Sequence, residues 1–173
     1  MALPSSQIRV ANNLPPIVSP GTRLLILGSL PGAASLAAAR YYAHPQNAFW
    51  RLVGGVIGRD LAALPYPERL EALTEAGVGL WDVIATAHRP GSLDGAIRSA
   101  EVADLNALVD SLPGLRAVAF NGGTAARIGR RSLAAGPNVE LIDLPSSSPA
   151  YTRPFADKAA AWSVLTHVLR QRP

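Results

Sequence analysis

The stretch RLLILGSLPG, residues 23–32, is an unbroken apolar run that ends at a glycine and continues into a tight turn. A short run of this kind predicts a strand buried on both faces, as in parallel sheets. Three similar runs follow, at residues 78–85, 116–120 and 139–143. Helical patterns separate or follow them at residues 47–57, 67–76, 101–111, 124–131 and 155–170, and Ser35 is a candidate cap for a short Ala-rich helix. The alternation predicts an α/β fold, a three-layer αβα sandwich around a mostly parallel sheet of about four strands.

Length and composition limit the classes of protein that remain possible. The chain has 173 residues, 49% of them hydrophobic and 16% charged, which suits one folded domain over residues 1–173. Residues 1–20 are rich in proline and asparagine, so we expect an extended lead-in there. Proline, glycine or charge interrupts every candidate membrane span, and the first residues lack the order of a secretory signal. We therefore expect a cytoplasmic protein with no membrane partner.

The absence of cysteine excludes disulfides, thiolate nucleophiles and cysteine zinc sites. The three histidines have no metal-ligand spacing, so we expect neither a metal nor a cofactor.

The basic residues are almost all arginines. Lysine and arginine number 16 against 12 acids, and Lys158 is the only lysine. Arginine is a better phosphate ligand than lysine, and a pI near 10.1 permits a nucleic-acid partner. A coding bias of the genome explains the high arginine content equally well. Lys158 lies between apolar positions of the last predicted helix, where we expect its head to reach water. Four arginines flank the last two strand-end loops: Arg127, Arg130, Arg131 and Arg153.

Ligands of such folds bind where the loops after parallel strands meet. Those loops are residues 28–50, 82–98, 121–127 and 144–155. Within the first, YYAHPQNAFW offers planar rings for a base and an amide that both donates and accepts, although Phe49 and Trp50 also suit a helix core. The candidate substrate-binding residues are Gly28, Ser29, Leu30, Pro31 and Gly32 of the turn, then Tyr42, His44, Phe49 and Asn121.

Asp82 is the one charged residue in the second predicted strand. An unpaired buried carboxylate is costly, so Asp82 lies either near the exposed strand end or beside an arginine such as Arg89 or Arg98. At the strand end it can accept an N–H from the lactam edge of a base. Asp94, in the segment GSLDG, is most simply a turn former, and residues 88–97 are expected to be a loop.

The fourth loop, LPSSSPAY, sets three serines between two prolines. Serine hydroxyls and free backbone N–H groups hydrogen-bond DNA phosphates well, and proline restricts the loop. A serine nucleophile is disfavoured because no GxSxG elbow is present. The candidate DNA-binding residues are Ser146, Ser147, Ser148, Pro149 and Arg153.

These segments together resemble the uracil-DNA glycosylase superfamily. The run GSLPG…SL…YYAHPQNAFW is similar to its first motif, and GLWDVIATAHRPGSLDGAI, AVAFNGGTAA and LPSSSPA follow in the order of its hypoxanthine-DNA (DNA-deoxyinosine) glycosylase branch. The resemblance covers residues 23–151. It implies the superfamily's fold and a monomeric enzyme that extrudes a deaminated base from DNA and hydrolyses its glycosidic bond. We expect a monofunctional enzyme, because strand cleavage by lyase chemistry needs an amine and Lys158 is the only lysine.

The resemblance also implies roles for single residues. Tyr42 occupies the position of an aromatic residue that stacks on the flipped base, and Asn47 matches an asparagine used in catalysis. Asp82 lies where relatives place a polar residue that recognises the base edge, so Asn47 and Asp82 are the candidate catalytic pair. Residues 146–148 fall in the second motif, which binds phosphates and fills the vacated stack.

Three departures from the superfamily's pattern bear on the substrate. Leu30 replaces a water-positioning asparagine of the mismatch-specific enzymes, and Leu144 replaces a frequent histidine; both agree with the deoxyinosine branch. Residues 87–88 replace a more polar pair, which leaves uracil excision open. Two further alternatives are a catalytically inactive DNA-damage binding module on this fold and a small nucleotide-binding enzyme. The last lacks a phosphate-binding fingerprint.

Overall fold

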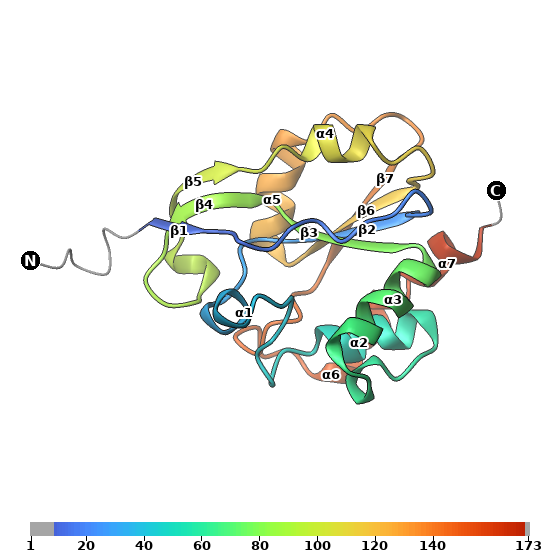
Figure 1. The fold of residues 1–173 in the computed structure, drawn as a ribbon, viewed down its shortest axis with the longest axis horizontal. Coiled ribbons are helices and arrows are strands. Elements are labelled where there is room, and N and C mark those ends of the chain that lie inside the picture. Colours follow the sequence, from blue (N-terminus) through green and yellow to red (C-terminus); the bar gives the residue numbers. More distant parts are fainter. Residues whose placement is uncertain (1–8, 172–173) are drawn as a thin grey trace, which may run out of the picture.

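The computed structural model describes residues 9–171, and its centre is a parallel sheet (Figure 1). The strand order is β3-β2-β6-β7, with β2 at Leu24–Gly28, β3 at Val78–Asp82, β6 at Ala117–Asn121 and β7 at Glu140–Leu144. Every neighbouring pair is parallel. The predicted α/β sandwich with a four-stranded parallel sheet is confirmed.

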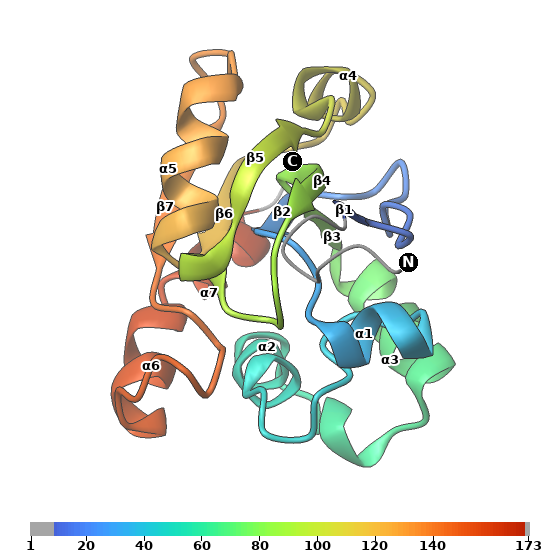
Figure 2. The same cartoon turned by 90° about the vertical axis from the view of Figure 1, so that its left-hand side faces the viewer.

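Helices cover both faces of the sheet, as the view in Figure 2 shows. One layer contains α2 (Phe49–Ile57), α3 (Tyr66–Ala76), α6 (Phe155–Trp162) and α7 (Leu165–Arg170). The other contains α4 (Leu105–Asp110) and α5 (Gly123–Ser132). The short α1 (Ala33–Ala38) follows the turn after β2, and two 3-10 turns lie at Leu61–Ala63 and Asp94–Ala96. None of the helices within residues 9–171 has the length and apolar character needed to cross a membrane.

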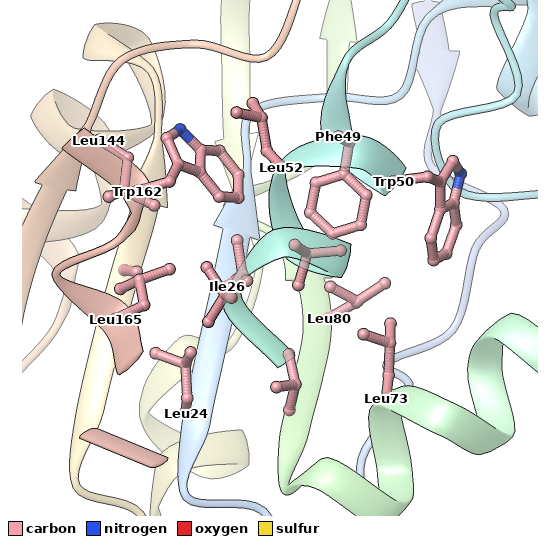
Figure 3. Close-up of a cluster of buried hydrophobic side chains, with 14 of the residues drawn as sticks. Leu24, Ile26, Phe49, Trp50, Leu52, Leu73, Leu80, Leu144, Trp162 and Leu165 are labelled. Atoms are coloured by element: carbon pink, nitrogen blue, oxygen red, sulfur yellow. The ribbon is translucent and has the colours of Figure 1, made fainter. Parts of the chain in front are cut away.

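Alternation along β2 divides the core between the two helical layers. Leu24 and Ile26 pack against α2, α3, α6 and α7, and Leu25 and Leu27 pack against α4 and α5. Figure 3 shows the first cluster, where the side chains of β2 and β3 meet the aromatic residues of α2 and α6. Each fully buried leucine stabilises the fold by about 1.5–3 kcal/mol. The strand ends are therefore held from both faces of the sheet.

A second, antiparallel sheet in the order β1-β4-β5 was not expected from the sequence. It consists of β1 (Arg9–Ala11), β4 (Ile84–His88) and β5 (Arg98–Val102). The predicted strand 78–85 is two strands, because the chain bends at Val83, whose N–H still donates to the Gly28 carbonyl of β2 at 2.8 Å while its own carbonyl accepts the Ala103 N–H. The apolar run shows no break at that point. β5 is exposed at every position, so it lacks the alternation that identifies a strand.

Three smaller predictions were wrong. The helix predicted from residue 101 begins at Leu105, because residues 101–102 belong to β5. The last predicted helix is two helices, α6 and α7. Ser35 does not cap α1 but lies buried within it, and its hydroxyl accepts the Ala43 N–H. The lead-in, expected to be extended, contributes the strand β1 to a sheet, and residues 1–8 lie outside the described part of the chain.

Candidate active site

The carboxyl ends of the four parallel strands form one row. Gly28, the last residue of β2, is paired with Asp82 at the end of β3, and Asn121 of β6 is paired with Leu144 of β7. The four loops expected to carry the site therefore start side by side. In this row Gly28, which has no side chain, lies next to the Asp82 carboxylate and the Asn121 amide.

Gly28 leaves room for two polar groups above the sheet. A Cβ at this position would lie 2.6 Å from Asp82 Oδ1 and 3.0 Å from Tyr42 Oη. The carboxylate and the phenol therefore meet over the glycine, although they come from residues 40 apart in sequence. The sequence predicted that Tyr42 and Asp82 share a site, and the structure brings them together.

Asp82 is buried, with 4% of its surface exposed. The pKa of its carboxyl is raised from 3.8 to about 7, mainly by burial; the hydrogen bond from Asn12 and the charge of Arg89 lower it, and the nearby Asp94 raises it. The same burial and the Asp82 carboxylate raise the pKa of the Tyr42 phenol, which stays neutral. Near neutral pH, Asp82 is therefore divided between its protonated and ionised forms.

Asn12 is a site residue that sequence analysis missed. Its Nδ2 donates to Asp82 Oδ2 at 3.0 Å, and its Oδ1 accepts the Leu14 N–H. An ion pair of Asp82 with Arg89 or Arg98 was the alternative left open, and none forms in the described chain. The arginine-rich neighbourhood suggested a salt bridge, but β1 carries the lead-in alongside β4 and places an amide there.

Tyr42 and Phe49 form an aromatic stack. Their rings are 3.8 Å apart at the centroids and 13° from parallel, and Trp50 lies edge-on to Tyr42. Phe49 is fully buried, so the structure places it behind Tyr42 and not at a ligand surface. Tyr42 is half-buried and has φ 51, a strained value for a residue with a side chain. The strained backbone holds the ring over Gly28 with one face covered by Phe49.

Asn121 connects the Tyr42 ring to the loop LPSSSPAY of residues 144–151, the serine loop. Its Nδ2 donates to Tyr42 Oη at 3.2 Å and to Ser147 Oγ at 2.9 Å, and its Oδ1 accepts the Ser147 N–H at 2.9 Å. Both amide hydrogens thus have protein partners, so Asn121 orients its neighbours. Gly122 follows at φ 101, and a Cβ there would lie 3.1 Å from the Cβ of Ser146. The loop after β6 therefore packs closely against the serine loop.

Asn47 lies at the start of α2, beside the serine loop. Its Oδ1 accepts the Phe49 N–H at 3.0 Å, and the next residue, Ala48, donates its N–H to the Ser147 carbonyl. No acceptor in residues 9–171 pairs with the Asn47 Nδ2 donors.

His44 is exposed, and its Nδ1 accepts the Gln46 N–H, which leaves Nε2 to carry the proton in the neutral ring.

The turn of residues 28–32 is held from behind by the loop after β4. Arg89, only 3% exposed, donates to the carbonyls of Leu30 and Pro31, and Ser29 Oγ donates to Asp94 Oδ1 at 2.7 Å. Burial raises the pKa of Asp94. Asp94 thus does more than form a turn. Leu30 is buried and Gly32 lies near Ser92, so only part of this turn is available to a ligand.

The serine loop is partly buried and partly open. Ser147 is 1% exposed, whereas Ser146 and Ser148 are half-buried and Pro149 and Arg153 are exposed. Lys158 differs from its prediction: it is 4% exposed, and its Nζ donates to the Ser148 carbonyl at 3.0 Å. The expectation that its head reaches water was wrong, because the first turn of α6 places it under the loop.

No group of three or more His, Asp or Glu side chains able to hold a metal ion occurs within residues 9–171. The polar groups gathered at the site are the Asp82 carboxylate, the Tyr42 phenol, serine hydroxyls and the amides of three asparagines, Asn12, Asn47 and Asn121.

We expect Gly28→Ala to displace the Asp82 carboxylate and the Tyr42 hydroxyl. The new methyl group would overlap the carboxylate at 2.6 Å, and overpacking of this kind costs about 1–3 kcal/mol of stability. Urea denaturation measures the loss. Gly55→Ala is the matched control, because a Cβ there meets nothing within 4 Å and the helix position favours alanine. Equal stability of the two variants would mean that Gly28 has more space than the structure shows.

Comparison with known proteins matches residues 15–166 to the family model of the uracil DNA glycosylase superfamily. The chain belongs to the uracil DNA glycosylase superfamily. Two curated relatives are both named hypoxanthine DNA glycosylase. The Methanosarcina barkeri protein is 40% identical over 149 residues, 86% of this chain and 93% of that protein. The Methanosarcina acetivorans protein is 36% identical over 156 residues, 90% of this chain and 98% of that protein.

A solved structure agrees with this membership. The solution NMR structure of a candidate uracil DNA glycosylase from Methanosarcina acetivorans matches the structure of this chain with a TM-score of 0.83 and 35% sequence identity. The match covers 95% of this chain and 100% of that one. The resemblance found in the sequence motifs is thus confirmed at the level of the superfamily.

Proposed function

We propose that this protein is a monofunctional DNA repair glycosylase that removes hypoxanthine from deoxyinosine in DNA. The observation that carries the proposal is the meeting of Tyr42 and Asp82 over Gly28 at the carboxyl edge of the sheet. A planar ring beside a buried acceptor suits a flipped base, and two relatives of similar length are named for hypoxanthine. We further propose a cytoplasmic monomer.

Base recognition follows from the two side chains. The open face of Tyr42 stacks on the base, while Phe49 supports the opposite face. Ionised Asp82 accepts the N1–H of hypoxanthine, and its charge repels adenine, whose N1 carries a lone pair and no hydrogen. Asn12 holds Oδ2 of the carboxylate, which leaves Oδ1 nearer Gly28 for the base.

Hydrolysis needs no strong nucleophile. The bond between the sugar C1′ and the base nitrogen breaks, the electron pair leaves with the base, and a water oxygen bonds to C1′. The attacking water gives up one proton to solvent and the base takes one from solvent, giving free hypoxanthine and an abasic site with a hydroxyl on C1′. The Nδ2 of Asn47 is available to hold the attacking water, and its Oδ1 stays fixed by the Phe49 N–H.

Binding to DNA is expected to weaken steeply with salt. Arg127, Arg131 and Arg153 are exposed, the first two on α5 and the third after the loop that follows β7, whereas Arg130 is paired with Asp143 at 2.9 Å. Each neutralised phosphate of a duplex contributes a slope of about −0.9 to log affinity against log salt. Fluorescence anisotropy of a labelled duplex over a salt series measures this slope. A flat response would contradict a DNA substrate.

We also expect the enzyme to leave the abasic strand uncut. Strand cleavage by lyase chemistry needs an amine that reaches the sugar C1′, and Lys158 Nζ is held at the Ser148 carbonyl beside the Tyr151 ring. Borohydride added during turnover should trap no protein–DNA adduct, and scission should require alkali. An adduct that disappears in Lys158→Ala would overturn this expectation.

Two other functions stay possible for the same fold. Uracil presents an N3–H that Asp82 accepts equally well, so the recognition described above does not exclude it. The buried Leu30 cannot hold water, which favours an inactive damage-binding module. Incubation of an inosine-containing duplex followed by alkaline cleavage separates the enzyme from the module: the proposal predicts cleavage at inosine, and intact bound DNA contradicts it.

A further inference from the structure

The proposed recognition of the base leaves the buried ammonium of Lys158 unexplained. Its Nζ donates to the Ser148 carbonyl and lies 5.4 Å from the centre of the Tyr151 ring. Within residues 9–171 no carboxylate lies within 4.0 Å of this nitrogen. An ammonium has three N–H donors, so a single carbonyl does not satisfy it.

A buried cation in these surroundings is poorly compensated. Removing an ammonium from water is costly unless an anion and further hydrogen bonds replace the solvent. A neutral carbonyl and a tyrosine ring return only part of that cost. Burial lowers the pKa of Lys158, as expected when no anion accompanies the charge. Among residues 9–171, the positive charge of Lys158 thus has no anionic partner in the free protein.

The position of Lys158 indicates which kind of anion its ammonium can bind. The Ser148 carbonyl also accepts the Tyr151 N–H, so the lysine lies under the turn that ends the serine loop. Arg153 is exposed just beyond this turn, and Arg51 lies over the Phe155 ring at 3.9 Å. Asp157, exposed in the first turn of α6, is the nearest acid in sequence. The surroundings are therefore mainly positive.

We propose that Lys158 is a phosphate ligand, whose ammonium receives a phosphodiester of the DNA strand that crosses the loop of residues 146–151. The inference rests on the proposed function, because DNA supplies the phosphodiester. The Ser148 carbonyl fixes the nitrogen and leaves two donors for the phosphate oxygens. Because the side chain is 4% exposed, only a strand seated directly against the loop reaches it.

The single lysine allows a direct test on the unaltered protein. Protein grown with carbon-13 lysine gives one lysine side-chain signal, whose pH titration needs no assignment. The titration is run free and with a duplex containing 2′-fluoro-deoxyinosine, which is not hydrolysed. Binding is expected to raise the Lys158 pKa by one unit or more, because a nearby anion favours the charged form. An unchanged pKa in a saturated complex would refute the phosphate contact.

A charge-removing variant gives an independent result. Lys158→Met is expected to reduce the salt slope of duplex binding by about 0.9, the value for one phosphate. Arg170→Met is the matched control: it removes one exposed charge on α7, near the opposite edge of the sheet, and should leave the slope unchanged.

The outcomes separate this inference from the proposed function. A wild-type slope retained in a folded Lys158→Met variant overturns the phosphate role and leaves the glycosylase intact. A wild-type protein that does not bind the duplex overturns the proposed function. If Lys158→Met does not fold, the titration of the wild-type lysine decides alone.

Discussion

Replacing Asn47 by alanine is expected to slow release of hypoxanthine from an inosine-containing duplex by about 100- to 1,000-fold. The reason is the loss of the Nδ2 donors, which have no protein acceptor in residues 9–171 and are free to hold the attacking water. Single-turnover rates measured with alkaline cleavage give the effect. Binding of the duplex should change little, because Asn47 is not among the candidate DNA-binding residues.

A structural contribution of Asn47 is separated by a second variant. The Oδ1 atom accepts the Phe49 N–H at the start of α2, and losing such a contact costs about 1 kcal/mol of stability. Asn47→Asp keeps this acceptor and removes only the donors. Both variants should therefore lose activity, while only Asn47→Ala should lose stability. An active Asn47→Asp variant would show that the amide hydrogens are not needed.

Asp82→Asn is expected to stabilise the protein at pH 8 and to have no such effect at pH 4. The folded pKa of about 7 lies above the ordinary 3.8, so the folded state favours the protonated carboxyl. The stability that this preference provides is complete below about pH 4 and is lost as the pH rises towards 7. Above pH 7 the loss is constant, at about 4 kcal/mol for a shift of about three units. An asparagine side chain does not ionise, so the Asp82→Asn variant does not suffer this loss of stability.

Urea denaturation of both proteins between pH 4 and 8 measures this difference. Asp60→Asn, which removes an exposed carboxylate, is the control for the loss of one negative charge. A constant difference across the range would contradict an elevated pKa of Asp82.

The same variant is expected to lose activity where it gains stability. If ionised Asp82 accepts the N1–H, kcat/KM for inosine should rise with pH through a midpoint near 7. Asp82→Asn should abolish that dependence and lower activity above pH 7 by about 10- to 100-fold, the value of a hydrogen bond to a charged group. A profile that rises towards low pH would mean that the protonated acid acts, donating to O6 of the base.

The parallel sheet could be predicted because its four strands are short, mainly apolar runs with turn signals between them. The antiparallel sheet could not, since β5 has no buried position and the run through Val83 conceals the change from β3 to β4. Strand order and register came only from the structure, and they bring Gly28 beside Asp82.

The site was predictable where single residues were unusual in their segment. Asp82 interrupts an apolar strand, and Tyr42 and Asn47 lie in a dense aromatic segment. Asn12 carried no such signal, because its contact with Asp82 spans 70 residues of sequence. Lys158 looked like a solvated helix residue, since helical spacing shows the face of a side chain but not the loop folded over it.

The most direct test of the account is base release by the wild-type protein from matched duplexes that contain inosine, uracil, xanthine or undamaged adenine at one position. Alkaline cleavage under single-turnover conditions measures each rate. The account predicts fastest release at inosine and none at adenine, because Asp82 requires an N–H at the base edge. Release of uracil alone, or binding of the inosine duplex without cleavage, would contradict it.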